Sequence, residues 1–217
     1  RNMRAAMALL ILVASLLPFV RISLMAWGHA WVGETRLWSL LAMLLLDGWL
    51  LLVVWAFALT KAPSLARALG LSGRRRLRLV GQSLRSYVGL FPWVFGLLWI
   101  MATLCQRLGI QPPLEPIHEL LFEEDRVLVV ALTVVLACLV GPIAEELFFR
   151  GILFAAIRTR SSRLIAILVS SSLFAAVHTN LVGFLPIALL GGLLASLYER
   201  TGSLWSSIVV HIVHNTF

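Results

Sequence analysis

Two adjacent carboxylates, Glu145 and Glu146, lie within one long apolar segment of this 217-residue chain. A charged side chain inside a membrane costs about 2.5–3.5 kcal/mol on insertion scales, so an adjacent pair requires a specific reason. Glu146 lies four residues before Arg150, and this spacing on a helix lets the two opposite charges neutralise each other. Glu145 points about 100° away from Glu146 and has no partner of this kind. We therefore predict that Glu145 is a reactive group.

Imidazole groups that could work with this carboxylate occur in two later apolar segments. His178 follows Phe174 by four residues, which places an aromatic ring beside the imidazole. His211 shares a helix face with Asn215, again four residues later. A carboxylate with one imidazole can activate a water molecule, and a second imidazole with an amide can stabilise an oxyanion. This set of groups suits the hydrolysis of a peptide bond.

Depth in the membrane is an independent criterion for whether these groups can meet. Counted from the nearest basic residue that marks the cytoplasmic surface, Glu145 lies ~20 Å along its helix, His178 ~22 Å and His211 ~17 Å. The marker residues are Arg158, Arg163 and Arg200, respectively. Groups at similar depths can converge in one water-filled pocket. Such a pocket could hold zinc through the same three residues, although the chain has no H-E-x-x-H pair, or it could work without a metal.

The composition shows which environment must hold these groups. Of the 217 residues, 60% are hydrophobic and 13% are charged, and the mean hydropathy is +0.96. No soluble domain of this length needs so much apolar surface. In lipid the backbone must satisfy its own hydrogen bonds, and apolar runs without period-two alternation favour helices over a β-barrel. We predict an all-α polytopic membrane helix bundle that forms one domain, residues 1–217, with a reactive core at about 127–217.

About seven transmembrane helices are predicted from apolar runs that approach the thickness of a bilayer. The first run follows basic residues but lacks a prompt cleavage site, so we expect a membrane helix and not a signal peptide. The chain begins without Met and stops within an apolar run, so we expect that both ends are trimmed and that the final helix is incomplete. If sequence is missing at the ends, an eighth helix is possible. The runs are 5–20, 37–59, 87–105, 127–149, 164–182, 184–198 and 203–217.

The net charge of +8 comes from basic residues in short segments between the apolar runs. This distribution does not form the basic face of a nucleic-acid-binding module, so we predict no nucleic-acid partner. The segment 61–85 is basic without any acid, whereas 106–126 is rich in acids, which predicts that 61–85 and the N-terminus face the cytoplasm. Within the basic segment, 64–71 and 77–84 are expected either as short amphipathic surface helices or as a solvated loop.

Three spaced motifs in the second half of the chain resemble those of the CPBP family of intramembrane proteases. This family includes the CAAX prenyl endopeptidases and bacteriocin-processing relatives. The resemblance covers about residues 140–217, and the order and spacing of the motifs agree with the family pattern. The motifs are Glu145-Glu146-x-x-x-Arg150, Phe174-x-x-x-His178 and His211-x-x-x-Asn215.

The resemblance implies a role for each of these residues. Glu145 would activate the attacking water with help from His178, while His211 and Asn215 would stabilise the tetrahedral oxyanion. The residues that would support the site are Glu146, Arg150 and Phe174. The resemblance also implies a glutamic-type protease that needs no cofactor, with zinc bound by Glu145, His178 and His211 as the alternative.

The chemistry and the resemblance together predict an intramembrane endopeptidase of a bacterial cell membrane. Its expected partners are membrane lipids and a protein or peptide precursor that is cleaved near its C-terminal tail and can be lipidated. One rival hypothesis is a non-enzymatic self-immunity factor or scaffold that keeps the motifs. Another is a transporter in which Asp47 joins Glu145 and Glu146 in carrying protons. We expect Asp47 instead to form a buried hydrogen bond with a neighbouring helix.

Overall fold

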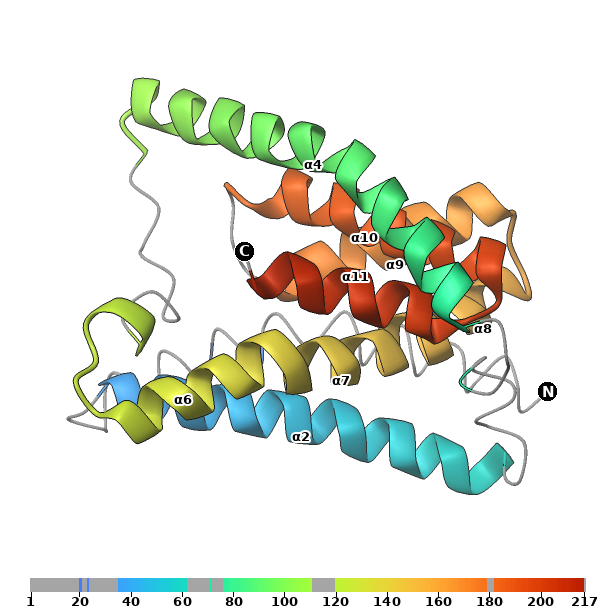
Figure 1. Ribbon diagram of the computed structural model, residues 1–217, viewed down its shortest axis with the longest axis horizontal. Coiled ribbons are helices and arrows are strands. Elements are labelled where there is room, and N and C mark those ends of the chain that lie inside the picture. Colours follow the sequence, from blue (N-terminus) through green and yellow to red (C-terminus); the bar gives the residue numbers. More distant parts are fainter. Residues whose placement is uncertain are drawn as a thin grey trace.

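The computed structural model describes residues 35–61, 76–110, 120–178 and 182–216, together with positions 20, 23 and 71. Every regular element within these ranges is a helix, which confirms the all-α prediction (Figure 1). Three helices in the described part are long and apolar enough to cross a membrane: Arg36–Ala58, Arg78–Arg107 and Val127–Arg158. The count of seven crossings therefore stays a prediction, and the run at 5–20 lies outside the described residues.

The first two described helices are α2 (Thr35–Lys61) and α4 (Arg76–Arg107). Helix α4 begins well before the predicted run at 87–105, because no proline interrupts its basic first turns. The segment 77–84 is therefore neither a separate surface helix nor a loop, and 64–71 lies outside the described residues except for its last position. Pro92 lies inside α4 and removes one backbone hydrogen bond, in agreement with the bend of this helix in Figure 1.

A single continuous helical stretch from Val127 to Arg158 carries both glutamates, and its hydrogen-bonding pattern widens twice. The first wide turn directly precedes Pro142, whose ring nitrogen cannot donate to the carbonyl one turn earlier. Wide turns of this kind are rare and occur frequently at functional sites. The stretch consists of α6 (Val127–Val135), the π-helix η1 (Leu136–Val140), α7 (Gly141–Phe148), the π-helix η2 (Phe149–Phe154) and α8 (Ala155–Arg158).

The last three helices are α9 (Arg163–Val177), α10 (Phe184–Thr201) and α11 (Leu204–Thr216). The Ser162 hydroxyl accepts a hydrogen bond from the Ile165 amide and caps the start of α9. Gly202 adopts a left-handed φ of 62° and ends α10, a conformation that costs glycine little. These helices correspond to the predicted runs at 164–182, 184–198 and 203–217.

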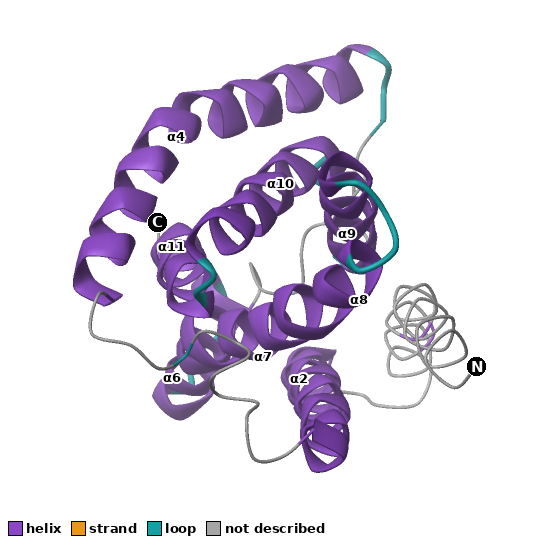
Figure 2. Ribbon diagram, turned by 90° about the vertical axis from the view of Figure 1, so that its right-hand side faces the viewer, coloured by secondary structure: helices purple, strands orange, loops and turns teal. Residues whose placement is uncertain are grey.

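The helices of the second half surround a common centre, with α2 and α4 outside them. Figure 2 shows α7, α8, α9, α10 and α11 arranged around this centre, and α10 packs against α9, α4 and α11. Helix α2 packs against α7 on one side of the bundle. The Lys61 end of α2, the start of α4 and the end of α8 lie at one end of the bundle in Figure 1. The end of α4 and the start of α6 lie at the opposite end, and the described acids Glu123, Glu124 and Asp125 lie just before α6.

Helix α10 approaches α9 most closely at Gly191. A Cβ atom placed on Gly191 would lie 3.0 Å from Ser171 Cβ and 3.1 Å from Phe174 Cδ1, which is too close for an unshifted neighbour. At the next residue, Gly192, the nearest atom would be Ile167 Cγ2 at 3.8 Å, an ordinary contact. The adjacent glycines therefore differ in the space around them: Gly191 requires the absence of a side chain, and Gly192 does not.

Replacing Gly191 with alanine is expected to lower the free energy of unfolding by about 1–3 kcal/mol, because overpacking forces α9 and α10 apart. The matched variant Gly192→Ala should leave stability unchanged or raise it by up to about 1 kcal/mol, because alanine favours helix over glycine. Denaturant titration of both purified variants in one detergent measures the difference. Equal stability of the two variants would contradict the close contact at Gly191.

Candidate active site

A buried network joins α7, η2 and α11 around Glu146. Arg150 Nη1 lies 2.9 Å from Glu146 Oε1, which confirms the ion pair predicted from their spacing. The same carboxylate oxygen lies 3.0 Å from His211 Nδ1. Glu146, Arg150 and His211 are 0%, 1% and 2% exposed, so water does not screen these interactions. Glu146 therefore orients the imidazole of His211 while Arg150 neutralises the carboxylate.

Glu145 lies on the open side of this network. Its side chain is 21% exposed, in contrast to the enclosed Glu146. Its Oε2 atom lies 3.8 Å from His211 Nε2, which is too far for a direct hydrogen bond. This oxygen is itself buried and has no hydrogen-bond partner among the described residues. A separation of this size between two polar atoms suits a bridging water molecule.

The tautomer of His211 follows from its two neighbours. Because Glu146 is paired with Arg150 and stays ionised, it accepts a hydrogen bond from the Nδ1–H of His211. In the neutral imidazole, Nε2 is then an acceptor that faces the Glu145 carboxylate. Two acceptors at this distance can both bind the hydrogens of one water. The geometry of Glu145 and His211 therefore leaves room for one water molecule between them.

Arg150 also connects this network to α9 and α10. Its Nη2 donates to the carbonyl of Gly191 at 3.1 Å, and its guanidinium carbon lies 4.4 Å from the centre of the Phe174 ring. The sequence indicated only the contact with Glu146, because i,i+4 spacing says nothing about partners on other helices. The close approach of α10 at Gly191 brings its carbonyl within reach of the guanidinium.

Phe174 lies between the two histidines of the predicted site. Its ring centre is 4.8 Å from that of His178 and 5.5 Å from that of His211, with an edge-on geometry toward the second ring. The predicted neighbourhood of Phe174 and His178 is therefore confirmed. His178 is half-buried, and its Nδ1 lies 2.8 Å from the Phe174 carbonyl, which fixes the orientation of the imidazole. In the structure Glu145 faces His211, whereas the resemblance pairs Glu145 with His178.

Asn215 follows His211 on the same helix, but its side-chain amide has a partner of its own. Its Nδ2 atom donates to the carbonyl of Ala137 at 2.9 Å, inside the π-helix η1. The amide nitrogen carries two hydrogens, so one remains for a further acceptor such as an oxyanion. The sequence could not predict the contact with Ala137, because it depends on the wide turn before Pro142.

His214 and Asp47 are two further polar groups within the bundle. The His214 Nδ1 atom lies 2.9 Å from the hydroxyl of Tyr87 and so joins α11 to α4. Nothing in the sequence singled out Tyr87, because a lone tyrosine in an apolar run carries no pattern. Asp47 lies on α2 against α7, with its Oδ2 atom 3.5 Å from the position that a Cβ of Gly141 would occupy. This position agrees with a contact between neighbouring helices.

Zinc bound by Glu145, His178 and His211 stays the alternative to a metal-free site. Within residues 35–61, 76–110, 120–178 and 182–216, no three His, Cys, Asp or Glu side chains are close enough to hold a metal ion. The Nδ1 atom of His211 is instead directed at Glu146, and that of His178 at a backbone carbonyl. The arrangement suits a carboxylate–imidazole site.

Comparisons with known proteins point to one family. Residues 127–217 match the family model described as type II CAAX prenyl endopeptidase Rce1-like. The chain is 38% identical over 93 residues to a Bacillus subtilis protein named "Putative membrane peptidase YdiL", covering 43% of this chain and 38% of that protein. It is 32% identical over 147 residues to an uncharacterized 24.3 kDa protein of Escherichia coli, covering 64% of this chain and 66% of that protein. No solved structure gave a match.

A third relative is the UPF0177 protein YxdF of Lactococcus lactis, 34% identical over 80 residues, which are 36% of this chain and 44% of that protein. The chain thus spans less than two thirds of the length of each of these three relatives. The matched family region includes α6 to α11 and hence every residue of the polar network described above.

Proposed function

We propose that this chain is an intramembrane endopeptidase of the CPBP family that uses Glu145 to activate water, because residues 127–217 match the Rce1-like CAAX prenyl endopeptidase model. The observation that carries the proposal is the position of the Glu145 carboxylate opposite His211. The two groups are 3.8 Å apart, and the carboxylate oxygen is buried without a partner among the described residues. A water between them is held by two acceptors at once.

The proposed reaction begins when this water attacks the carbonyl carbon of the scissile peptide bond. Glu145 takes the proton of the water as the new C–O bond forms, and the carbonyl oxygen becomes an oxyanion. We propose that His178 and the second amide hydrogen of Asn215 lie on the substrate side of the site and stabilise this oxyanion. The C–N bond then breaks, and Glu145 returns the proton to the leaving amine. His211 keeps the water in position because Glu146 and Arg150 hold its ring.

We further propose that the substrate is a membrane-associated protein or peptide precursor that is cleaved near its C-terminal tail. In this proposal the tail can be lipidated, and the cleavage takes place within a bacterial cell membrane. The matched relatives are bacterial, and the described chain has three helices of membrane-spanning length. The basic segment 61–85 and the N-terminus are proposed to face the cytoplasm.

Isotope labelling tests whether water performs the reaction. The protein, reconstituted in vesicles, is incubated in H₂¹⁸O with a panel of tailed and lipidated precursors, and new termini are identified by mass spectrometry. Hydrolysis is expected to place one ¹⁸O atom on the new C-terminal carboxylate. If no precursor yields a new terminus, while expression of the protein still protects producer cells in an immunity assay, a non-enzymatic binding role replaces the peptidase.

Removal of divalent metal tests the proposed chemistry separately. We expect that dialysis against a strong chelator leaves hydrolysis within about twofold of the untreated rate, because a carboxylate and an imidazole supply the base without a Lewis acid. The measurement is the rate of terminus formation before dialysis, after dialysis and after zinc is restored. A large loss that zinc reverses would instead favour a site formed by Glu145, His178 and His211.

A further inference from the structure

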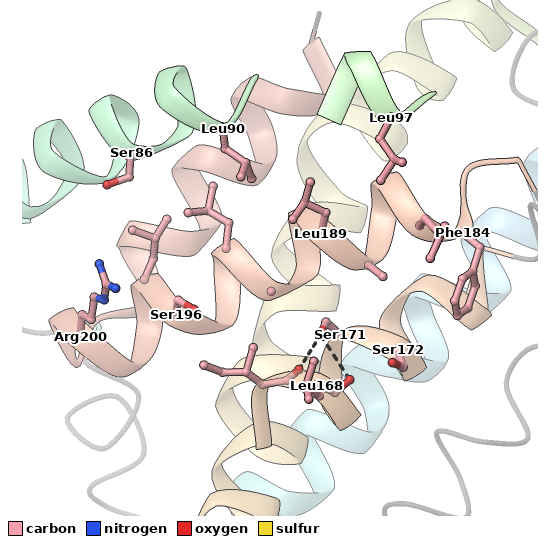
Figure 3. Close-up of a pocket in the computed structure, with 16 residues that line it drawn as sticks. Ser86, Leu90, Leu97, Leu168, Ser171, Ser172, Phe184, Leu189, Ser196 and Arg200 are labelled. Carbon is pink, nitrogen blue, oxygen red and sulfur yellow. Dashed lines mark hydrogen bonds between the residues drawn. The ribbon is translucent and has the colours of Figure 1, made fainter. Parts of the chain in front are cut away.

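A long groove lies apart from the polar network, over the outer face of α10. It is lined by α4, α9 and α10, has a volume of about 630 Å³, and contains none of the residues of the proposed catalytic site. We call it the α4–α10 groove. Figure 3 shows Leu90 and Leu189 along its middle, with Leu97 and Phe184 toward one end. Its volume falls within the range of small-molecule sites, which is about 300–1,000 Å³.

The two ends of the groove differ in chemistry. Phe184 and Leu97 form an apolar end, whereas Ser86 and Arg200 lie together at the other end (Figure 3). Arg200 is exposed and forms no ion pair with any described residue. Its neighbour Glu199 is already engaged by Arg158 at 2.8 Å. Among the described residues the groove therefore presents a cation without a paired acid at one end and mainly apolar side chains along the rest.

Other basic residues strengthen the positive end. Arg78 and Arg85 lie on the first turns of α4, at the same end of the bundle as the end of α10, and both are exposed. No described acid pairs with either of them. A basic site between membrane helices on one side of the bilayer is a characteristic binding place for anionic lipid head groups.

The length of the groove agrees with one membrane leaflet. From Phe184 to Arg200, α10 rises ~24 Å at ~1.5 Å per residue. One leaflet, with its half of the hydrocarbon core and its head groups, is about 20–22 Å thick. The floor of the groove carries Ala188, Gly192 and Ser196, whose small side chains leave room for a chain to lie against α10.

We propose that the α4–α10 groove binds one anionic phospholipid. The phosphate contacts Arg200 and the hydroxyl of Ser86, and an acyl chain lies along Leu90 and Leu189 toward Phe184. A free phosphate would use only the basic end, and a neutral lipid would leave Arg200 without a counter-charge. The proposal does not depend on peptidase activity, because lipid binding is measured without any substrate.

Native mass spectrometry of the purified full chain, with defined lipids titrated in, tests this site. The probes are dioleoyl phosphatidylglycerol, dioleoyl phosphatidylcholine and glycerol 3-phosphate. We expect one tightly bound phosphatidylglycerol, an apparent Kd at least tenfold lower than for phosphatidylcholine, and no retained glycerol 3-phosphate. Equal binding of the two lipids, or retention of glycerol 3-phosphate alone, would overturn the proposal.

Three variants locate the binding within the molecule. Arg200→Gln should abolish the tenfold preference, whereas Arg160→Gln should preserve it, since Arg160 is equally exposed but does not line the groove. Gly192→Leu fills the floor and should abolish tight binding while the protein still elutes as a folded species at the volume of the unchanged protein. A preference lost equally in both arginine variants would show a diffuse basic surface. If Gly192→Leu left lipid binding unchanged but altered dimerisation, the groove would be assigned to a second copy of the chain. If it left lipid binding unchanged but abolished precursor cleavage, the groove would be assigned to a substrate helix.

Discussion

Replacing Glu145 with glutamine should lower the rate of peptide hydrolysis by at least about 10³-fold, within the range of 10²–10⁴ typical of a general base. Glutamine has nearly the same size and can still hold a water molecule, but it cannot accept the proton of that water. Because Glu145 is partly exposed and has no ion pair at hydrogen-bonding distance, the variant should remain folded. The rate of terminus formation under saturating precursor measures the effect, and gel filtration checks the fold.

The matched control for this experiment is Glu199→Gln. It removes the same charge from an ion pair with Arg158 at the end of α10, outside the polar network. We expect near-normal hydrolysis from this variant. If Glu145→Gln were as active as Glu199→Gln, the proposed base would be wrong. If the Glu145 variant kept an immunity phenotype in cells while losing hydrolysis, the two functions would be separate.

The second large effect is expected in stability, from the buried pair of Glu146 and Arg150. Replacing Arg150 with methionine leaves the Glu146 carboxylate enclosed without its cation, which should lower the free energy of unfolding by about 3–5 kcal/mol. It also removes the donor to the Gly191 carbonyl and the contact with the Phe174 ring. Denaturant titration in detergent measures the loss.

The double variant Glu146→Gln/Arg150→Met separates charge from packing. It removes both charges together, so most of the lost stability should return, because no uncompensated ion remains buried. Hydrolysis should not return with it, because the His211 ring then lacks its ionised partner. A double variant no more stable than Arg150→Met would show that the guanidinium acts through Gly191 and Phe174 instead of through Glu146.

Contacts within one helix were predictable, because helical geometry alone determines them. The pairing of Glu146 with Arg150 and of Phe174 with His178 follows from a spacing of four residues, and both pairs occur. The helical rise also predicted that Glu145 and His211 lie at similar depths in the membrane, and the structure places the two side chains 3.8 Å apart. The all-helical architecture followed from the need of the backbone to satisfy its hydrogen bonds in lipid.

Contacts between helices were less predictable, because helices that are apolar on all sides carry little information about their rotation. The amide of Asn215 meets the carbonyl of Ala137 inside the π-helix η1, which no spacing in the sequence predicted. Likewise, Tyr87 meets His214 through packing that no local pattern specifies.

The sequence by itself thus determined the membrane environment, the helical fold and the chemical types of the reactive groups, because composition and helical periodicity are local properties. Only the tertiary structure decided that His211 lies between the two carboxylates. It alone shows that Glu146 is enclosed while Glu145 is open, and that a groove with one charged end lies beside α10. The physical reason is that the burial and partner of a polar group depend on the neighbouring helices, whose close approach at positions such as Gly191 is settled by packing.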